Sequence, residues 1–195
     1  MTRESGPARR STAARGRAPG RKSRGRSGGV ATAESRSPAR FAISVRDEQA
    51  HLSVSAARIR KIARLVLTTE EVAGATISIA LVDNRTIHAL NRKHLNHDYE
   101  TDVLSFLFDS DAETTAVATA PRTPRGKNLC IDGEIVISAE MAVQAAPRFD
   151  WGAADELALY LVHGLLHLCG YDDQTEGERR LMRKRERAIL KLLGD

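Results

Sequence analysis

The stretch DELALYLVHGLLHLCGYDD, residues 155–173, decides the fold of this chain and carries its candidate chemistry. Its first three turns are almost entirely apolar, which predicts a helix buried on most sides. Gly170 is expected to end that helix, because glycine adopts the left-handed conformation of a helix C-terminus without the steric cost of a Cβ atom. The chain can then turn back and bring the following residues towards the end of the helix.

Two histidines lie four residues apart in this stretch. Residues at positions i and i+4 of a helix share a face, with Cβ atoms about 5–6 Å apart, so His163 and His167 can reach one ion. Asp172 and Asp173 follow the turn and can supply a third ligand. Two imidazoles and one carboxylate leave a coordination position open on a zinc-like ion, the pattern of a catalytic site. The alternative is a chance spacing, which the cost of burying unpaired imidazoles disfavours.

The chain of 195 residues changes composition near residue 40. Residues 1–40 contain eleven Lys or Arg against two Glu, a net charge of +9. Because the whole chain carries +5, residues 41–195 sum to −4. The first segment has almost no large apolar side chains and is expected to be a disordered tail. A basic tail attracts RNA through its phosphates; the alternatives are a solvated extension, an organellar transit peptide or a start codon assigned too far upstream.

Residues 41–195 are expected to form one domain in a reducing, cytoplasmic setting. No apolar run is long enough to span a membrane, and the tail lacks the apolar segment of a secretory signal. Cys130 and Cys169 do not form a disulfide framework pattern. Cys169 is expected to be a buried thiol, because its place two residues after His167 points it away from the proposed site.

Hydrophobic patterning predicts four strands, with helices between and after them. The fold class is therefore α+β, a single mixed four-stranded sheet packed with helices, with a metal site at the end of a buried helix. A mobile loop is expected at residues 109–130, which contain Pro121, Pro124 and Gly126. The expected strands are residues 41–45, 75–82, 102–108 and 131–138; the expected helices begin at Ser53 or Ser55, at Asn84, after residue 138, in the histidine stretch and at a Thr175–Glu178 capping box.

Hydrolysis is the expected chemistry of such an ion, because a bound divalent metal acidifies its water and polarises a carbonyl or phosphoryl oxygen. Metallopeptidases with the HExxH helix use the glutamate after the first histidine as general base. Here that position is Gly164, which disfavours a peptidase. Phosphodiester hydrolysis depends more on charge stabilisation and loses less by the missing glutamate.

Three motifs resemble those of the YbeY family, the single-strand-specific endoribonucleases and ribosomal RNA maturation factors of bacteria and organelles. Residues 163–173, HGLLHLCGYDD, are similar to the family signature HGxLHLxGYDH. Residues 101–106, TDVLSF, and residues 133–138, GEIVIS, agree with two further family motifs in the same order. The resemblance covers most of residues 41–195 and excludes the tail.

The resemblance implies a zinc-dependent endoribonuclease that matures the 3′ end of small-subunit rRNA and takes part in ribosome quality control. The small ribosomal subunit and its assembly factors are the implied partners, with one Zn²⁺ per chain. His163 and His167 carry over as ligands, and Asp173 replaces the third histidine of the family. Carboxylate for imidazole is acceptable zinc chemistry. Asp172 matches the family aspartate and is expected to orient a ligand or to replace one.

A second departure from the family lies ahead of TDVLSF, where an arginine within LNxxYR is replaced by Leu95. Arg92, Lys93 and His97 lie close by and are the candidate RNA-binding residues; the alternative is that they are solvated charges. Three functions therefore stay open. The favoured one is the metal-dependent endoribonuclease. The others are a ribosome assembly factor with a structural metal and little or no catalysis, and a metallopeptidase.

Overall fold

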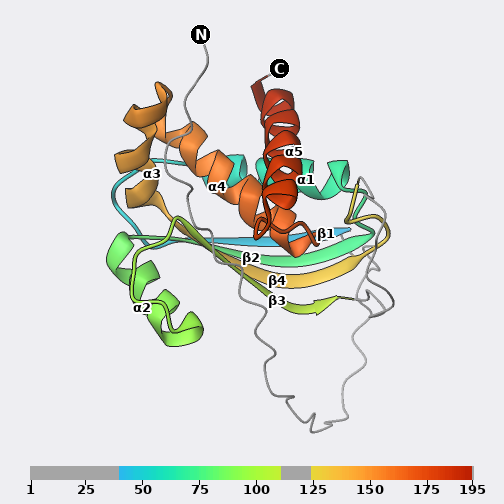
Figure 1. The fold of residues 1–195 in the computed structure, drawn as a ribbon, viewed down its shortest axis with the longest axis horizontal. Helices are drawn as coiled ribbons and strands as arrows, with labels where there is room; N and C mark the ends of the chain where they lie inside the picture. The colour runs from blue at the N-terminus through green and yellow to red at the C-terminus, as the bar shows by residue number, and fades with distance from the viewer. Residues whose placement is uncertain (1–39, 111–123, 195) are drawn as a thin grey trace, which may run out of the picture.

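The computed structural model describes residues 40–110 and 124–194 (Figure 1). The predictions of a disordered tail over residues 1–40 and of a mobile loop over residues 109–130 concern, for the most part, residues outside this range. The described end of that loop, residues 124–129, forms a turn. The amide of Asn128 donates to the carbonyl of Glu71 at 3.1 Å, which ties this turn to the residues that follow the first helix, α1 Ala56–Thr69.

One mixed sheet of four strands forms the centre of the domain, as the sequence predicts. Its order is β1-β2-β4-β3, with β1, β2 and β4 parallel and β3 antiparallel to β4. Both strands extend slightly into the range expected as a loop: β3 continues to Ser110, which pairs with Ile131, and β4 begins at Cys130. The strands are β1 Phe41–Asp47, β2 Gly74–Val82, β3 Val103–Ser110 and β4 Cys130–Ser138.

Helices cover both faces of the sheet unequally. α1, α4 and α5 pack with the larger apolar core on one face, while α2 packs on the other face (Figure 1). The smaller core under α2 consists of Val82, Ile87, Leu104 and Val136. The helices are α1 Ala56–Thr69, α2 Asn84–Leu95, α3 Ala139–Ala145, α4 Ala153–Leu168 and α5 Glu176–Gly194, with a short 3-10 helix, η1, at Ala146–Phe149.

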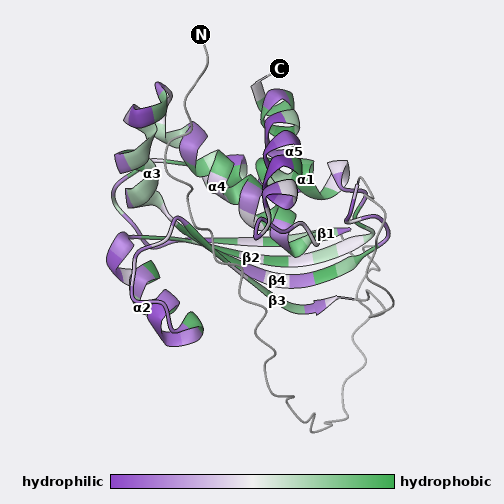
Figure 2. Ribbon diagram, in the orientation of Figure 1, coloured by the Kyte–Doolittle hydropathy of each residue, from purple (hydrophilic) through white to green (hydrophobic). Residues whose placement is uncertain are grey.

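α4 lies centrally in the larger core, as its composition predicts. Leu157, Leu161, Leu165 and Leu166 are at most 1 % exposed. The ribbon of α5 is mostly purple, the colour of hydrophilic residues, in contrast to the apolar composition of α4 (Figure 2). α5 buries only Met182, Glu186 and Ile189. In the described part of the chain, no helix is long and apolar enough to cross a membrane.

Side chains cap the helices at the predicted places with one exception. Ser55 caps α1 by accepting from the amide of Arg58 at 3.2 Å. Thr175 and Glu178 form the expected capping box at the start of α5: each side chain accepts from the other residue's amide, at 2.9 and 3.2 Å. Reciprocal bonds of this kind satisfy amides that a helix start leaves without partners.

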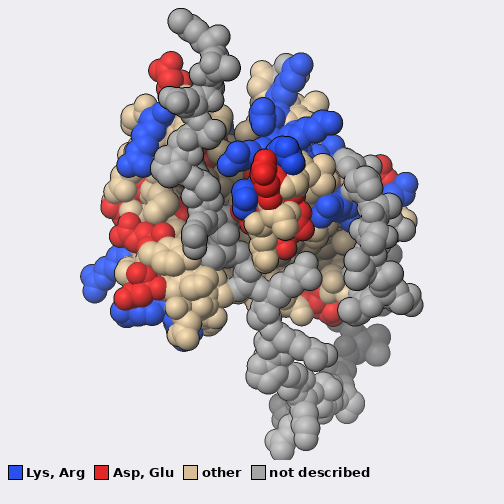
Figure 3. All heavy atoms as spheres, viewed as in Figure 1, with Lys and Arg blue, Asp and Glu red and all other residues tan. Residues whose placement is uncertain are grey.

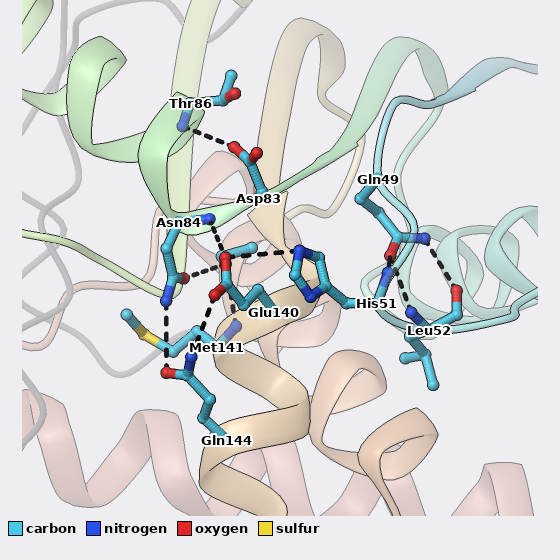
Figure 4. A network of polar contacts seen from close by, with 10 residues as sticks. Gln49, His51, Leu52, Asp83, Asn84, Thr86, Glu140, Met141 and Gln144 are labelled. Carbon is cyan, nitrogen blue, oxygen red and sulfur yellow. Dashed lines mark hydrogen bonds and ion pairs between the residues drawn. The ribbon is translucent and has the colours of Figure 1, made fainter.

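The predicted cap at Asn84 is wrong. Asp83 caps α2, its carboxylate accepting from the amide of Thr86 at 2.8 Å (Figure 4). Asn84 is buried instead, its amide donating to Glu140 at 3.0 Å and its side-chain oxygen accepting from the hydroxyl of Ser138. Either residue type can cap a helix. The burial of Asn84 against α3, a tertiary contact, decides between the two.

Candidate metal centre

The end of α4 and the turn after it build the site. Gly170 has a φ of +92°, and its amide and that of Tyr171 donate to the carbonyls of His167 and Leu166, both at 3.0 Å. These bonds satisfy carbonyls that the helix end leaves without partners. The glycine prediction is thereby confirmed, and the turn directs Asp173 back towards the two histidines.

His163, His167 and Asp173 each offer one ligand atom, and these atoms lie within 4.8 Å of one another. The Nε2 atoms of the two histidines face each other at 3.1 Å. The other ring nitrogen of His167, Nδ1, donates a hydrogen bond to the carbonyl oxygen of Tyr171 at 3.0 Å. Nδ1 of His163 donates a hydrogen bond to the carboxylate of Glu186 at 2.6 Å.

These contacts fix which nitrogen of each ring is available. A carbonyl oxygen and a carboxylate accept hydrogen bonds, so each Nδ1 carries a proton and the two Nε2 atoms are left facing each other. Either a proton on one of the two rings or a metal cation can lie between two nitrogens this close. Two nitrogens bound to a tetrahedral zinc at 2.0–2.1 Å would lie about 3.3 Å apart, close to the separation seen here. The three residues therefore fit a small divalent ion.

The electrostatics differ between the two rings. Burial, and then the nearby His163, lower the pKa of His167 to about 4. Burial also acts to lower the pKa of His163, but the hydrogen bond and charge of Glu186 outweigh it and raise that pKa above its ordinary value. At neutral pH His167 is therefore neutral, and its Nε2 lone pair can bind a cation, while Glu186 stabilises positive charge at His163, from a proton or from a bound metal ion.

Asp173 is partly buried, and its carboxylate lies close to the two histidines. Burial raises its pKa and the charge of Asp172 adds to this, while His163 and Arg179 act in the opposite direction. Asp172 accepts from the amide of Asp173 at 2.8 Å, so its carboxylate fixes the turn. The Arg179 guanidinium donates to the carbonyl of Asp173 at 3.0 Å. A bound cation would stabilise the ionised form of Asp173.

Glu186 and Asp102 are two acidic residues of the site to which the sequence reasoning gave no role. Glu186 lies on the buried face of α5, four residues after Met182 and three before Ile189. The sequence signal that could have identified Glu186 is its charge on an otherwise apolar helix face. Asp102, in the TDVLSF motif, contributes to raising the pKa of His163.

We expect Glu186→Gln to weaken zinc binding by about tenfold, because carboxylates that orient a ligating histidine contribute 10- to 100-fold to metal affinity. A competition titration against a fluorescent zinc chelator measures this. Glu176→Gln is the control: it removes the same charge from α5 at a side chain that is 78 % exposed. Equal affinities of the two variants would limit Glu186 to a packing role.

Gly164 and Cys169 lie near the histidines but do not face the site. A Cβ at residue 164 would lie 3.0 Å from both Ser105 Oγ and Val103 Cγ2, because this side of α4 packs against β3. The glutamate of a peptidase helix would therefore be tightly crowded at this position. Cys169 is 1 % exposed, and burial raises the pKa of its thiol far above the ordinary value. The prediction that it is a buried thiol is confirmed.

The structure does not bring the candidate RNA-binding residues to this site. Arg92 and Lys93 are exposed on α2, which packs on the opposite face of the sheet (Figure 1). Arg92 lies 3.9 Å from Asp98, and the His97 ring stacks on Tyr99 with centroids 5.3 Å apart. Leu95 packs against the smaller core, so an apolar contact occupies the position of the family arginine.

Fold and site together define a class: an α+β domain with a His-His-carboxylate group at the end of a buried helix. Residues 43–194 match the family model described as Endoribonuclease YbeY. The chain belongs to the YbeY family.

Three similar proteins, each named Endoribonuclease YbeY, support this assignment. The protein of Chloroflexus aggregans is 39% identical over 73% of this chain and 90% of its own length. That of Rhodopirellula baltica is 36% identical over 61% of this chain, and the match spans 54% of that longer protein. That of Carboxydothermus hydrogenoformans is 38% identical over 64% of this chain and 77% of its own length. All three matches are long enough to include most of residues 41–195.

Proposed function

We propose that this protein is a zinc-dependent endoribonuclease that cuts single-stranded RNA, with His163, His167 and Asp173 as the metal ligands. The observation that carries the proposal is the pair of Nε2 atoms 3.1 Å apart, with Asp173 completing the group. Membership of the YbeY family supports RNA as the substrate. In the cell we place this activity in the cytoplasm, at the 3′ end of small-subunit rRNA and in ribosome quality control, with the small subunit and its assembly factors as partners.

The chain's own residues would hold the ion and its surroundings in place. When bound, zinc lowers the pKa of a water ligand towards neutrality and polarises a phosphoryl oxygen. Glu186 and the Tyr171 carbonyl keep the proton of each ring on Nδ1, which leaves Nε2 free for the ion. Asp172 orients Asp173 by accepting a hydrogen bond from its backbone amide, and Arg179 places a positive charge beside it.

A metallopeptidase is the weaker reading of the same site. Zinc peptidases of the HExxH type need a carboxylate at the position of Gly164. This chain has glycine there, and Ser105 and Val103 would crowd any larger side chain. RNA hydrolysis needs stabilisation of phosphate charge instead, which a metal and nearby arginines provide.

A ribosome assembly factor with a structural metal is the second candidate, and Leu95 favours it. Its side chain packs in the apolar core under α2, so it gives no positive charge for a phosphate. Arg92, Lys93 and His97 remain the proposed substitutes on that helix and in the segment after it. Protein stripped of metal that still binds the small subunit, while holo protein fails to cut RNA, would support this candidate.

We expect the zinc-loaded protein to cleave a single-stranded RNA, and a chelator to remove this activity until zinc is added back. A duplex of the same sequence and a peptide library serve as the comparison substrates. Cleavage of the single strand alone supports the proposed endoribonuclease. Cleavage of peptides, or RNA cleavage that persists in excess chelator, would contradict it. Gel analysis of end-labelled RNA and mass spectrometry of the peptides give the two readouts.

A further inference from the structure

We propose that a basic stripe on α5 binds the phosphate backbone of the RNA that enters the metal site; this rests on the proposed function. Five exposed residues form the stripe. They follow one another at intervals of one, three or four residues, which places them on one side of the helix. From Arg180 to Lys191 the stripe spans about 16 Å at the helical rise of about 1.5 Å per residue. Its members are Arg180, Arg183, Lys184, Arg187 and Lys191.

The stripe opposes the charge of the rest of the domain. α5 contains seven Lys or Arg and three Glu, a net charge of +4. Because residues 41–195 sum to −4, those outside α5 sum to −8. Figure 3 shows blue Lys and Arg side chains gathered over α5. A polyanion such as RNA would therefore be attracted to this helix and repelled by much of the remaining surface.

Most of this charge is available to a ligand. Among the residues that the structure describes, Arg183, Lys184, Arg187 and Lys191 form no ion pair with a carboxylate. Arg180 pairs with Glu176 at 3.6 Å, with both side chains more than 70 % exposed. Such exposed pairs contribute little energy and are readily exchanged for a phosphate.

The stripe leads directly to the metal centre. Arg179 precedes Arg183 by one helical turn, and its guanidinium donates to the carbonyl of Asp173. Glu186, on the adjacent side of the same helix, holds His163. An RNA strand lying along α5 would therefore reach the ion where the N-terminal half of the helix contacts the metal ligands. α5 would both orient a metal ligand and bind the substrate backbone.

The test compares the full-length, zinc-loaded protein with the triple variant Arg183→Gln, Lys184→Gln, Arg187→Gln. The probe is a fluorescein-labelled 2′-O-methyl oligouridine of about 20 nucleotides, longer than the footprint of a typical single-strand binding module. Binding is measured by anisotropy over a range of salt concentrations. Each lost phosphate contact should flatten the slope of log K against log salt by about 0.7, so three should flatten it by about 2 and weaken binding about 100-fold near 0.1 M salt.

Arg58→Gln, Lys61→Gln, Arg64→Gln is the matched control, since it removes the same residue types from exposed positions of α1. We expect its salt slope to stay near that of the wild type. Equal losses in both triples would overturn the proposal in favour of a general charge effect. So would wild-type binding by the α5 variant, or a loss confined to Arg92→Gln, Lys93→Gln. Zinc content and circular dichroism check folding, and because the readout is binding, it stands whether or not the protein cleaves RNA.

Discussion

Replacing His167 with alanine is expected to remove the bound zinc and the RNA cleavage together. The substitution takes away one of three ligand atoms and leaves the Nε2 of His163 without its facing partner. Groups that only orient a ligand contribute 10- to 100-fold to affinity or activity, so losing a ligand should cost more than about 100-fold in each. Zinc per chain is measured by elemental analysis, and cleavage with an end-labelled single-stranded RNA.

His88→Ala is the control for this experiment. His88 is also a histidine on a helix, but it lies on α2 and its Nε2 contacts Asp98 at 2.8 Å. We expect this variant to keep its zinc and its activity. If wild-type protein holds zinc without cutting RNA, the assembly-factor function replaces the endoribonuclease. If His167→Ala retains a full complement of zinc, the ion is bound elsewhere and the ligand assignment is wrong.

Local rules explain why the histidine helix could be predicted. Helical spacing brings His163 and His167 together whatever surrounds them, and Gly170 marks the turn through its backbone freedom. The four strands follow from short apolar runs that are rich in β-branched residues or alternate with polar ones, such as residues 75–82. The Thr175–Glu178 capping box is likewise a contact between residues three apart. Each of these features depends on residues that lie close together in the sequence.

Features that depend on the packing of distant elements were not predictable in the same way. Glu186 and His163 are 23 residues apart in sequence and meet only because α5 docks on α4. The basic stripe on α5 reads from the sequence as solvated charge until Arg179 is seen to contact Asp173. The choice of Asp83 over Asn84 as a cap depends on α3. In each case the partner lies on another element, and no local pattern identifies it.

Glu70→Gln is expected to lower the free energy of unfolding by about 3 kcal/mol, the size of effect seen when one partner of a buried ion pair is removed. Glu70 is 0 % exposed at the end of α1 and forms an ion pair with Arg185 of α5. It also accepts from the Tyr171 hydroxyl at 3.1 Å and from the amide of Arg125 at 3.0 Å. Glutamine keeps the shape but leaves the Arg185 charge without its carboxylate.

The neighbouring residue gives a matched control. Glu71 pairs with Lys127 at 3.2 Å, but their side chains are 49 % and 60 % exposed. Exposed pairs are screened by water and contribute at most about 1 kcal/mol, so Glu71→Gln should leave the urea midpoint close to that of the wild type. Midpoints and slopes from urea unfolding compare the two variants. Equal midpoints would mean that the buried pair adds nothing to stability.

A double variant separates the lost pair from the charge it leaves behind. In Glu70→Gln, Arg185→Met no charge remains at this place, and replacing a whole buried pair costs much less than breaking it. We therefore expect the double variant to be more stable than Glu70→Gln alone. Because Tyr171 supplies the carbonyl that orients His167, Glu70 also connects the packing of α5 to the metal centre. Zinc affinity should therefore fall in Glu70→Gln and stay unchanged in Glu71→Gln.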